Sequence, residues 1–115
     1  IEESCALIDE RLGRRFRSRL GYQSKLGPIA WLGPATGDVL AELAREGTRQ
    51  LVVCPVAFVS DHVETLYEIR ILFAEEAKSL GIPHYVAADG LNDHPAFIDA
   101  LADVCRKALP GRGEL

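Results

Sequence analysis

The chain alternates between short runs of β-favouring residues and longer stretches with the apolar spacing of helices. Residues 51–54 (Leu-Val-Val-Cys) form a continuous apolar run, typical of a strand buried on both faces of a parallel sheet, and residues 83–88 form a second run. Helices are predicted over residues 1 to about 19, 36–46, about 61–80 and 95–109, and a short strand over 20–25. Strands separated by helices imply right-handed crossovers. We therefore expect an α/β fold, a Rossmann-like three-layer αβα arrangement around a small parallel sheet.

The composition is that of an ordinary globular domain, with 48% hydrophobic and 26% charged residues among 115. A net charge of −4 argues against nucleic acid as a partner. No apolar stretch approaches the ~18 residues that a membrane-spanning helix needs. The three cysteines are far apart in sequence, which indicates unpaired thiols in a reducing compartment and a cytoplasmic location. Because the sequence contains no methionine, we expect it to be a piece of a longer protein.

Five arginines cluster near the end of the first predicted helix. They are Arg11, Arg14, Arg15, Arg17 and Arg19. Such a cluster is typical of a solvated basic face, and the alternative is an anion-binding or membrane-facing surface. Peripheral association with the inner membrane therefore stays open.

The loop after residues 51–54 is the leading candidate for a site. In parallel α/β sheets, ligands bind at the carboxyl ends of the strands. Residues 55–64 occupy that place and bring Ser60, Asp61, His62 and Glu64 to it. Asp61 and Glu64 also have the spacing of a helix capping box, which would be a purely structural role.

Two long blocks carry a family resemblance. Residues 22–34 read YQSKLGPIAWLGP and residues 55–69 read PVAFVSDHVETLYEI. Both blocks, and the distance between them, closely resemble the ferrochelatase family. Their residues are more similar to its protoporphyrin-using branch than to its coproporphyrin-using branch. The resemblance implies that residues 1–115 are the C-terminal half-domain of an enzyme that inserts Fe²⁺ into protoporphyrin IX. It also implies that the N-terminal half-domain is absent here and that the chain alone is inactive.

The resemblance assigns catalytic roles to His62 and Glu64. It also assigns metal handling to these two residues together with Glu68. Metal insertion requires a group that takes up pyrrole protons and ligands for Fe²⁺, and an imidazole and a carboxylate supply both functions. Taken without the resemblance, His62 could be an ordinary loop histidine and Glu68 a solvated helix residue.

The resemblance also implies three porphyrin-binding residues, Ser24, Trp31 and Phe58. An aromatic ring offers a large apolar surface to a flat macrocycle, and a hydroxyl can donate to a propionate. Trp31, Phe58 and His62 are expected to line one concavity. The structural alternatives are a lid over the core for Trp31 and a turn hydroxyl for Ser24.

Two departures from the family pattern concern metals. Many members continue an acidic ladder at positions where this chain has Arg70 and Leu72, which puts an acid-lined metal route along this helix in doubt. Some members hold a [2Fe–2S] cluster with closely spaced cysteines, whereas Cys105 is solitary here, so no cluster is expected. Fe²⁺ is expected as a substrate, without a resident cofactor.

Two other functions stay open on the sequence alone. One is a related chelatase that acts on a different tetrapyrrole, although the block around Trp31 argues against it. The other is a non-catalytic α/β ligand-binding domain. The partners expected under the first interpretation are protoporphyrin, ferrous iron and the N-terminal half-domain of the same chain.

Overall fold

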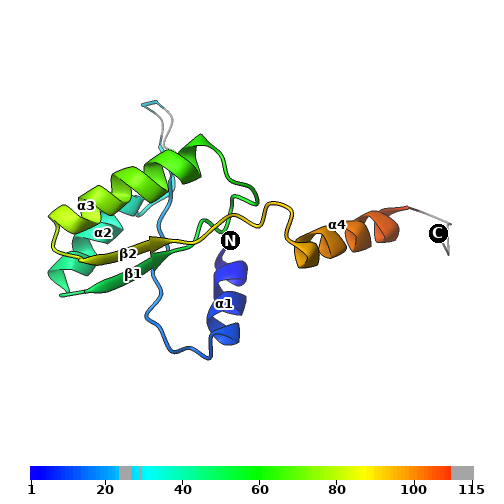
Figure 1. The fold of residues 1–115 in the computed structure, drawn as a ribbon, viewed down its shortest axis with the longest axis horizontal. Coiled ribbons are helices and arrows are strands. Elements are labelled where there is room, and N and C mark those ends of the chain that lie inside the picture. The colour runs from blue at the N-terminus through cyan, green and yellow to red at the C-terminus, as the bar shows by residue number, and fades with distance from the viewer. Residues whose placement is uncertain (24–26, 29, 110–115) are drawn as a thin grey trace.

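The computed structural model describes residues 1–23, 27–28 and 30–109. Its elements follow the predicted order of helices and strands (Figure 1). They are α1 (Glu2–Arg11), α2 (Thr36–Arg45), β1 (Gln50–Val53), the π-helix η1 (Glu64–Leu72), α3 (Phe73–Ser79), β2 (His84–Ala87) and α4 (Pro95–Ala108).

The two strands pair in parallel, in a register that runs from Gln50 opposite His84 to Val53 opposite Ala87. The connection between them is η1 followed directly by α3, so the unit is a βαβ crossover. This confirms the predicted α/β class with a small parallel sheet. The strand predicted over residues 20–25 is reduced to one isolated parallel bridge between Tyr22 and Ala35. Residues 24 and 25 lie outside the described residues.

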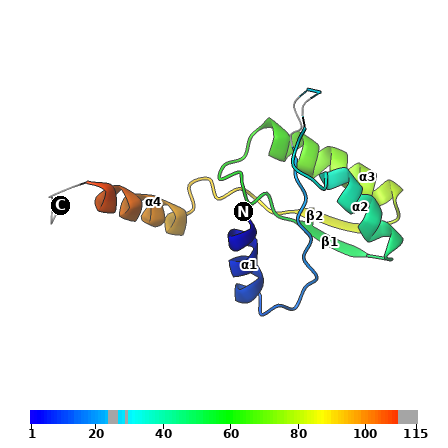
Figure 2. The ribbon, with the colours of Figure 1, turned by 180° about the vertical axis from the view of Figure 1, so that it is seen from behind.

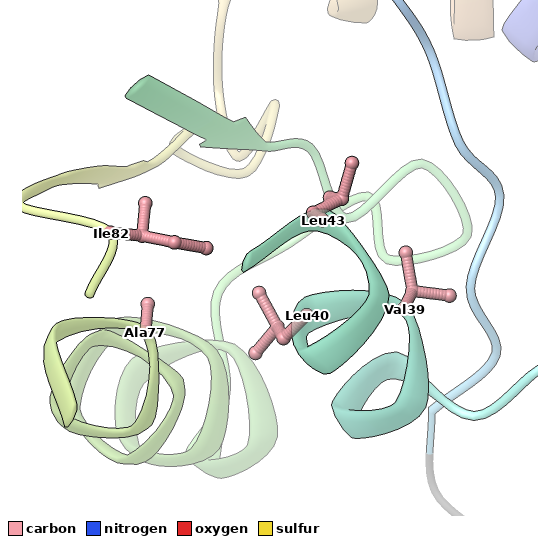
Figure 3. Packing of buried hydrophobic residues seen from close by; sticks show 5 residues of the cluster. All are labelled: Val39, Leu40, Leu43, Ala77 and Ile82. Atoms are coloured by element: carbon pink, nitrogen blue, oxygen red, sulfur yellow. The ribbon is translucent and has the colours of Figure 1, made fainter. Parts of the chain in front are cut away.

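The core lies between the sheet and the helices α2 and α3. Apolar residues of α2 recur at a helical spacing and face Ala77 of α3 and Ile82, which leads into β2 (Figure 3). The most deeply buried large side chains of this cluster are Leu40, which is 2% exposed, and Ile82, which is 1% exposed. Leu51 and Tyr85 pack against the cluster from the inner face of the sheet.

The opposite face of the sheet is open in the described part of the chain. Val52 is 69% exposed and Val86 is 58% exposed, because the remaining helices do not lie over it. Figures 1 and 2 show from two sides that α4 projects beyond the end of the sheet, and α1 lies near the same end. The expectation that residues 51–54 are buried on both faces is therefore wrong for these residues, although the class of fold is right.

The helix boundaries differ from the predicted ones where backbone turns intervene. The first helix ends at Arg11, well before residue 19, because Gly13 and Arg14 both adopt positive φ (69° and 52°). The chain then extends, and Arg17 and Arg19 form exposed ion pairs with Glu46 beyond the end of α2 (3.1 and 3.4 Å). The helix predicted over 61–80 is η1 plus α3, and Gly81 (φ 90°) ends it. Within the described residues, no helix has the length and apolar character needed to cross a membrane.

Tyr85 links β2 to η1, and its environment predicts a pH effect. Its hydroxyl donates to the Ile69 carbonyl (2.6 Å), and burial raises the pKa of Tyr85 to about 12. The folded state thus favours the neutral phenol. Its contribution to stability is complete below the unfolded pKa of about 10 and is lost as the pH rises towards about 12.

We expect Tyr85→Phe to lower the free energy of unfolding by about 1 kcal/mol at neutral pH, because one hydrogen bond is lost. The variant should also lose less thermal stability than the parent between about pH 8 and about pH 11. Thermal unfolding followed by circular dichroism measures both effects. Tyr67→Phe is the control, since Tyr67 is 51% exposed on η1, the helix that carries Ile69. If raising the pH lowers the thermal stability of the parent and of Tyr85→Phe equally, Tyr85 is not the source of the pH effect.

Candidate functional site

The loops that follow the two strands meet at one edge of the sheet. The Ala88 N–H donates to the Val53 carbonyl (2.8 Å), so the chains are still paired where the loops begin. A pocket of about 160 Å³ lies here, lined by α1 and both loops: Ile8, Cys54, Pro55, Val56, Phe58, Asp89, Gly90 and Leu91. This is the edge that the sequence predicted, where ligands of parallel sheets bind.

His62 lies at the start of η1 with its ring held on two sides. Its Nδ1 accepts a hydrogen bond from the Glu64 N–H (3.2 Å). The ring packs edge-on against Phe58, with centroids 4.5 Å apart and an interplanar angle of 68°. The structure therefore brings together Phe58, His62 and the backbone of Glu64, three residues that the sequence singled out.

Hydrogen bonds of His62 hold the backbone that leads into η1. The Leu66 N–H bonds to the His62 carbonyl (2.9 Å), so the helical turn extends back to His62. The His62 N–H donates to the Thr65 hydroxyl (2.9 Å), and the His62 ring accepts from Glu64. The bond from the His62 N–H to the side chain three residues on is one half of a capping box, whereas the His62 ring accepts from the residue two positions on.

Asp61 contacts the loop that follows β2. Its carboxylate accepts hydrogen bonds from the Asn92 amide (3.0 Å) and the Gly90 N–H (3.3 Å), and it pairs with Arg70 (3.5 Å). The hydrogen bond from Asn92 is the main reason why the pKa of Asp61 is below its ordinary value. The bonds from Gly90 and Thr65 and the charge of Arg70 act in the same direction, against partial desolvation. Asp61 is therefore a carboxylate with a structural role.

Glu68 and Trp31 are connected through Gln23, which sequence reasoning did not single out. The Gln23 side-chain amide donates to the Glu68 carboxylate, and the Gln23 carbonyl accepts from the Trp31 indole (3.0 Å). Gln23 lies inside the first family-like block, which is the signal that could have identified it. Trp31 is 44% exposed and, like His62, does not line the 160 Å³ pocket, whereas Phe58 does.

The acidic residues of η1 are placed by an uncommon helix. A π-helix closes i→i+5 hydrogen bonds and occurs frequently at functional sites. Glu64 and Glu68 lie one turn apart along it. Arg70, which stands at a position of the family's acidic ladder, pairs with Asp61 and Asp89.

Within the described ranges, no group of three or more His, Cys, Asp or Glu side chains is placed so that it could hold a metal ion. The structure does not gather His62, Glu64 and Glu68 into a preformed metal site, and their metal role stays a prediction. Ser24 lies outside the described residues, so its predicted contact with a propionate stays a prediction as well.

Comparisons with known proteins agree with the two sequence blocks. A family model described as Ferrochelatase matches residues 1–109. The chain is 47% identical over 109 residues to a ferrochelatase of Geotalea uraniireducens, covering 95% of the chain and 34% of that relative. It is 48% identical to a ferrochelatase of a Nostoc species and 45% identical to one of Gloeothece citriformis, covering 28% of each. The chain thus spans about a third or less of these curated relatives, and it belongs to the ferrochelatase family.

Proposed function

We propose that this chain is the C-terminal half-domain of a ferrochelatase and contributes to a site that inserts Fe²⁺ into protoporphyrin IX to form haem. The observation that carries the proposal is the position of His62 and Glu64. They lie in one helical turn, where the loop that follows β1 leads into η1, with Phe58 against the imidazole. The relatives are named ferrochelatases, and the chain matches a third or less of their length. The activity is therefore proposed for a longer protein that includes an N-terminal half-domain, and residues 1–115 alone should be inactive.

The proposed chemistry assigns proton uptake to Glu64. Metal insertion removes two pyrrole protons, and an anionic carboxylate at the start of η1 can accept a proton. His62 contributes a second polar group in the same turn. Glu68, one turn further along η1, is proposed to handle Fe²⁺ before insertion, since carboxylate oxygen and imidazole nitrogen are both suitable ligands for this ion.

The proposed porphyrin contacts come from two segments. Phe58 supplies an apolar wall at the edge of the sheet, and Trp31, which is 44% exposed, supplies an aromatic surface for stacking. Ser24 is proposed to donate to a propionate. Fe²⁺ acts as a substrate, and neither a resident cofactor nor a [2Fe–2S] cluster is proposed. We propose a cytoplasmic location, either free or in peripheral contact with the inner membrane.

The test is haem formation from protoporphyrin IX and Fe²⁺ under anaerobic conditions by three proteins. They are the full-length protein that carries this chain, the chain alone, and the Geotalea relative with residues 1–109 in place of its matching third. We expect haem from the first and third proteins and none from the second. A folded but inactive replacement would contradict the proposed activity. A preference of about tenfold or more for coproporphyrin would contradict the proposed substrate.

A further inference from the structure

We propose that Asn92 and Asp61 are positioning residues, which hold His62 in place by tying the loop after β2 to the first turn of η1. This inference rests on the proposed function, since it gives His62 its orientation for that reaction. The residues Asp61, Arg70, Gly90 and Asn92 are called the Asp61 clasp below. Arg70 and Asp61 belong to the connection between the strands, and the other two residues follow β2.

Asn92 binds Asp61 at two points, which only a side chain with both a donor and an acceptor can do. Its Oδ1 accepts from the Asp61 backbone N–H (2.8 Å), and its Nδ2 donates to the Asp61 carboxylate (3.0 Å). The Asn92 N–H in turn donates to the Val59 carbonyl (2.9 Å). Asn92 also adopts a positive φ of 48°, a conformation that asparagine tolerates better than most residues. The backbone and the side chain of Asn92 therefore hold the loop after β1 and the loop after β2 together.

Gly90 lets the two loops approach this closely. A Cβ at this position would lie 2.9 Å from the Asp61 nitrogen and 3.1 Å from the Ser60 carbonyl carbon, both of which are backbone atoms. The Gly90 N–H also donates to Asp61 (3.3 Å). The contact is therefore a direct backbone-to-backbone approach, and the loop after β2 limits how far residues 60–62 can move.

The constraint passes from Asp61 to His62 through Thr65, which is 2% exposed. The Thr65 hydroxyl is within hydrogen-bond distance of the Asp61 carboxylate (3.2 Å) and the His62 carbonyl (3.1 Å), and it accepts from the His62 N–H (2.9 Å). Its single hydrogen serves one of the two acceptors at a time. Because the His62 ring also bonds to the Glu64 N–H and packs on Phe58, fixing the His62 backbone fixes the imidazole.

Arg70 balances the charge of the clasp. The Asp61 side chain is 20% exposed, and Arg70 pairs with it (3.5 Å) and with Asp89. A carboxylate with so little solvent needs such partners, because an isolated buried charge is costly. Asp61 thus stays charged and able to accept the hydrogen bonds that hold Asn92 and Thr65.

The test is a double-mutant cycle between Asn92 and His62 in the full-length protein. We expect Asn92→Ala to lower kcat by about 10- to 100-fold, the usual range for a residue that orients a functional group, with little change in the KM for porphyrin. In a His62→Ala background, the same change should cost less than about threefold, because the residue that it orients is gone. Asp93→Ala, at the neighbouring exposed position, is the matched control and should leave kcat unchanged. Thermal unfolding of every variant separates positioning from unfolding.

Asn92→Asp serves as a second variant if Asn92→Ala does not fold, because it keeps the size and the backbone preference but cannot donate to Asp61. Equal costs with and without His62, or a loss of less than about threefold in the wild-type background, would overturn the positioning role. If His62→Ala itself retains activity within about threefold, the proposed role of His62 fails, and the clasp cannot act through it. The first two results contradict the clasp alone, so the two failures can be told apart.

Discussion

Glu64→Gln in the full-length protein is expected to lower kcat by about 10²- to 10⁴-fold, with little change in the KM for porphyrin. Glutamine keeps the shape and some of the hydrogen bonding of glutamate but cannot accept a pyrrole proton or bind Fe²⁺ as an anion. A single general base typically contributes a factor of this size. An interaction made only in the transition state appears in kcat. Steady-state haem synthesis, with porphyrin and ferrous iron varied separately, measures both constants.

Two further variants define how specific this loss is. Glu68→Gln should cost less, and mainly in the KM for iron, because Glu68 lies one turn further along η1 and is hydrogen-bonded to Gln23. Glu75→Gln, on the exposed surface of α3, should have no effect. Glu64→Gln activity within about threefold of wild type would leave Glu64 with no chemical role.

Leu40→Ala is expected to lower the free energy of unfolding of this chain by about 2–5 kcal/mol. Leu40 is 2% exposed at the centre of the only buried cluster in the described residues, so truncation removes buried methyl groups and leaves a cavity. The stability of a small domain is about 5–15 kcal/mol, so the loss is a large part of the total. Urea unfolding followed by circular dichroism measures it.

Leu7→Ala is the matched control for this prediction. Leu7 is 58% exposed on α1, which has no buried residues. Its truncation should change the free energy of unfolding by less than about 0.5 kcal/mol, as is usual at the surface. If the two leucine variants lose equal stability, the cluster between the sheet and the helices α2 and α3 is not the core of the chain.

The elements that could be predicted are those with a strong local pattern. The helix Thr36–Arg45 has a regular apolar face, and both strands are short β-favouring runs, so each was predicted within one or two residues. The helix after residue 1 ended early because two consecutive residues turn to positive φ, one of them an arginine whose sequence gives no warning of it. Burial of 51–54 on both faces failed because an apolar run cannot show which faces the neighbouring helices cover.

The candidate site could be predicted only in part, for a related reason. His62, Glu64 and Phe58 lie close together in sequence, and a family-like block contains them. Asn92 and Gln23 reach their partners across 31 and 45 residues, and no local pattern records such contacts. The Asp-x-x-Glu spacing also did not show that Asn92 binds Asp61 from the other loop.

The hydrogen bond between the Glu64 N–H and His62 Nδ1 also fixes the tautomer of the imidazole. Since Nδ1 accepts, the neutral ring carries its hydrogen on Nε2, which is then a donor. For Nε2 to bind a metal or take up a proton, the ring hydrogen must occupy Nδ1 instead, and there it would face another N–H. Coordination through Nε2 is therefore coupled to breaking this bond in the first turn of η1. While this hydrogen bond is intact, His62 can donate a hydrogen bond through Nε2, and the proton acceptor that we propose in the same turn is the carboxylate of Glu64.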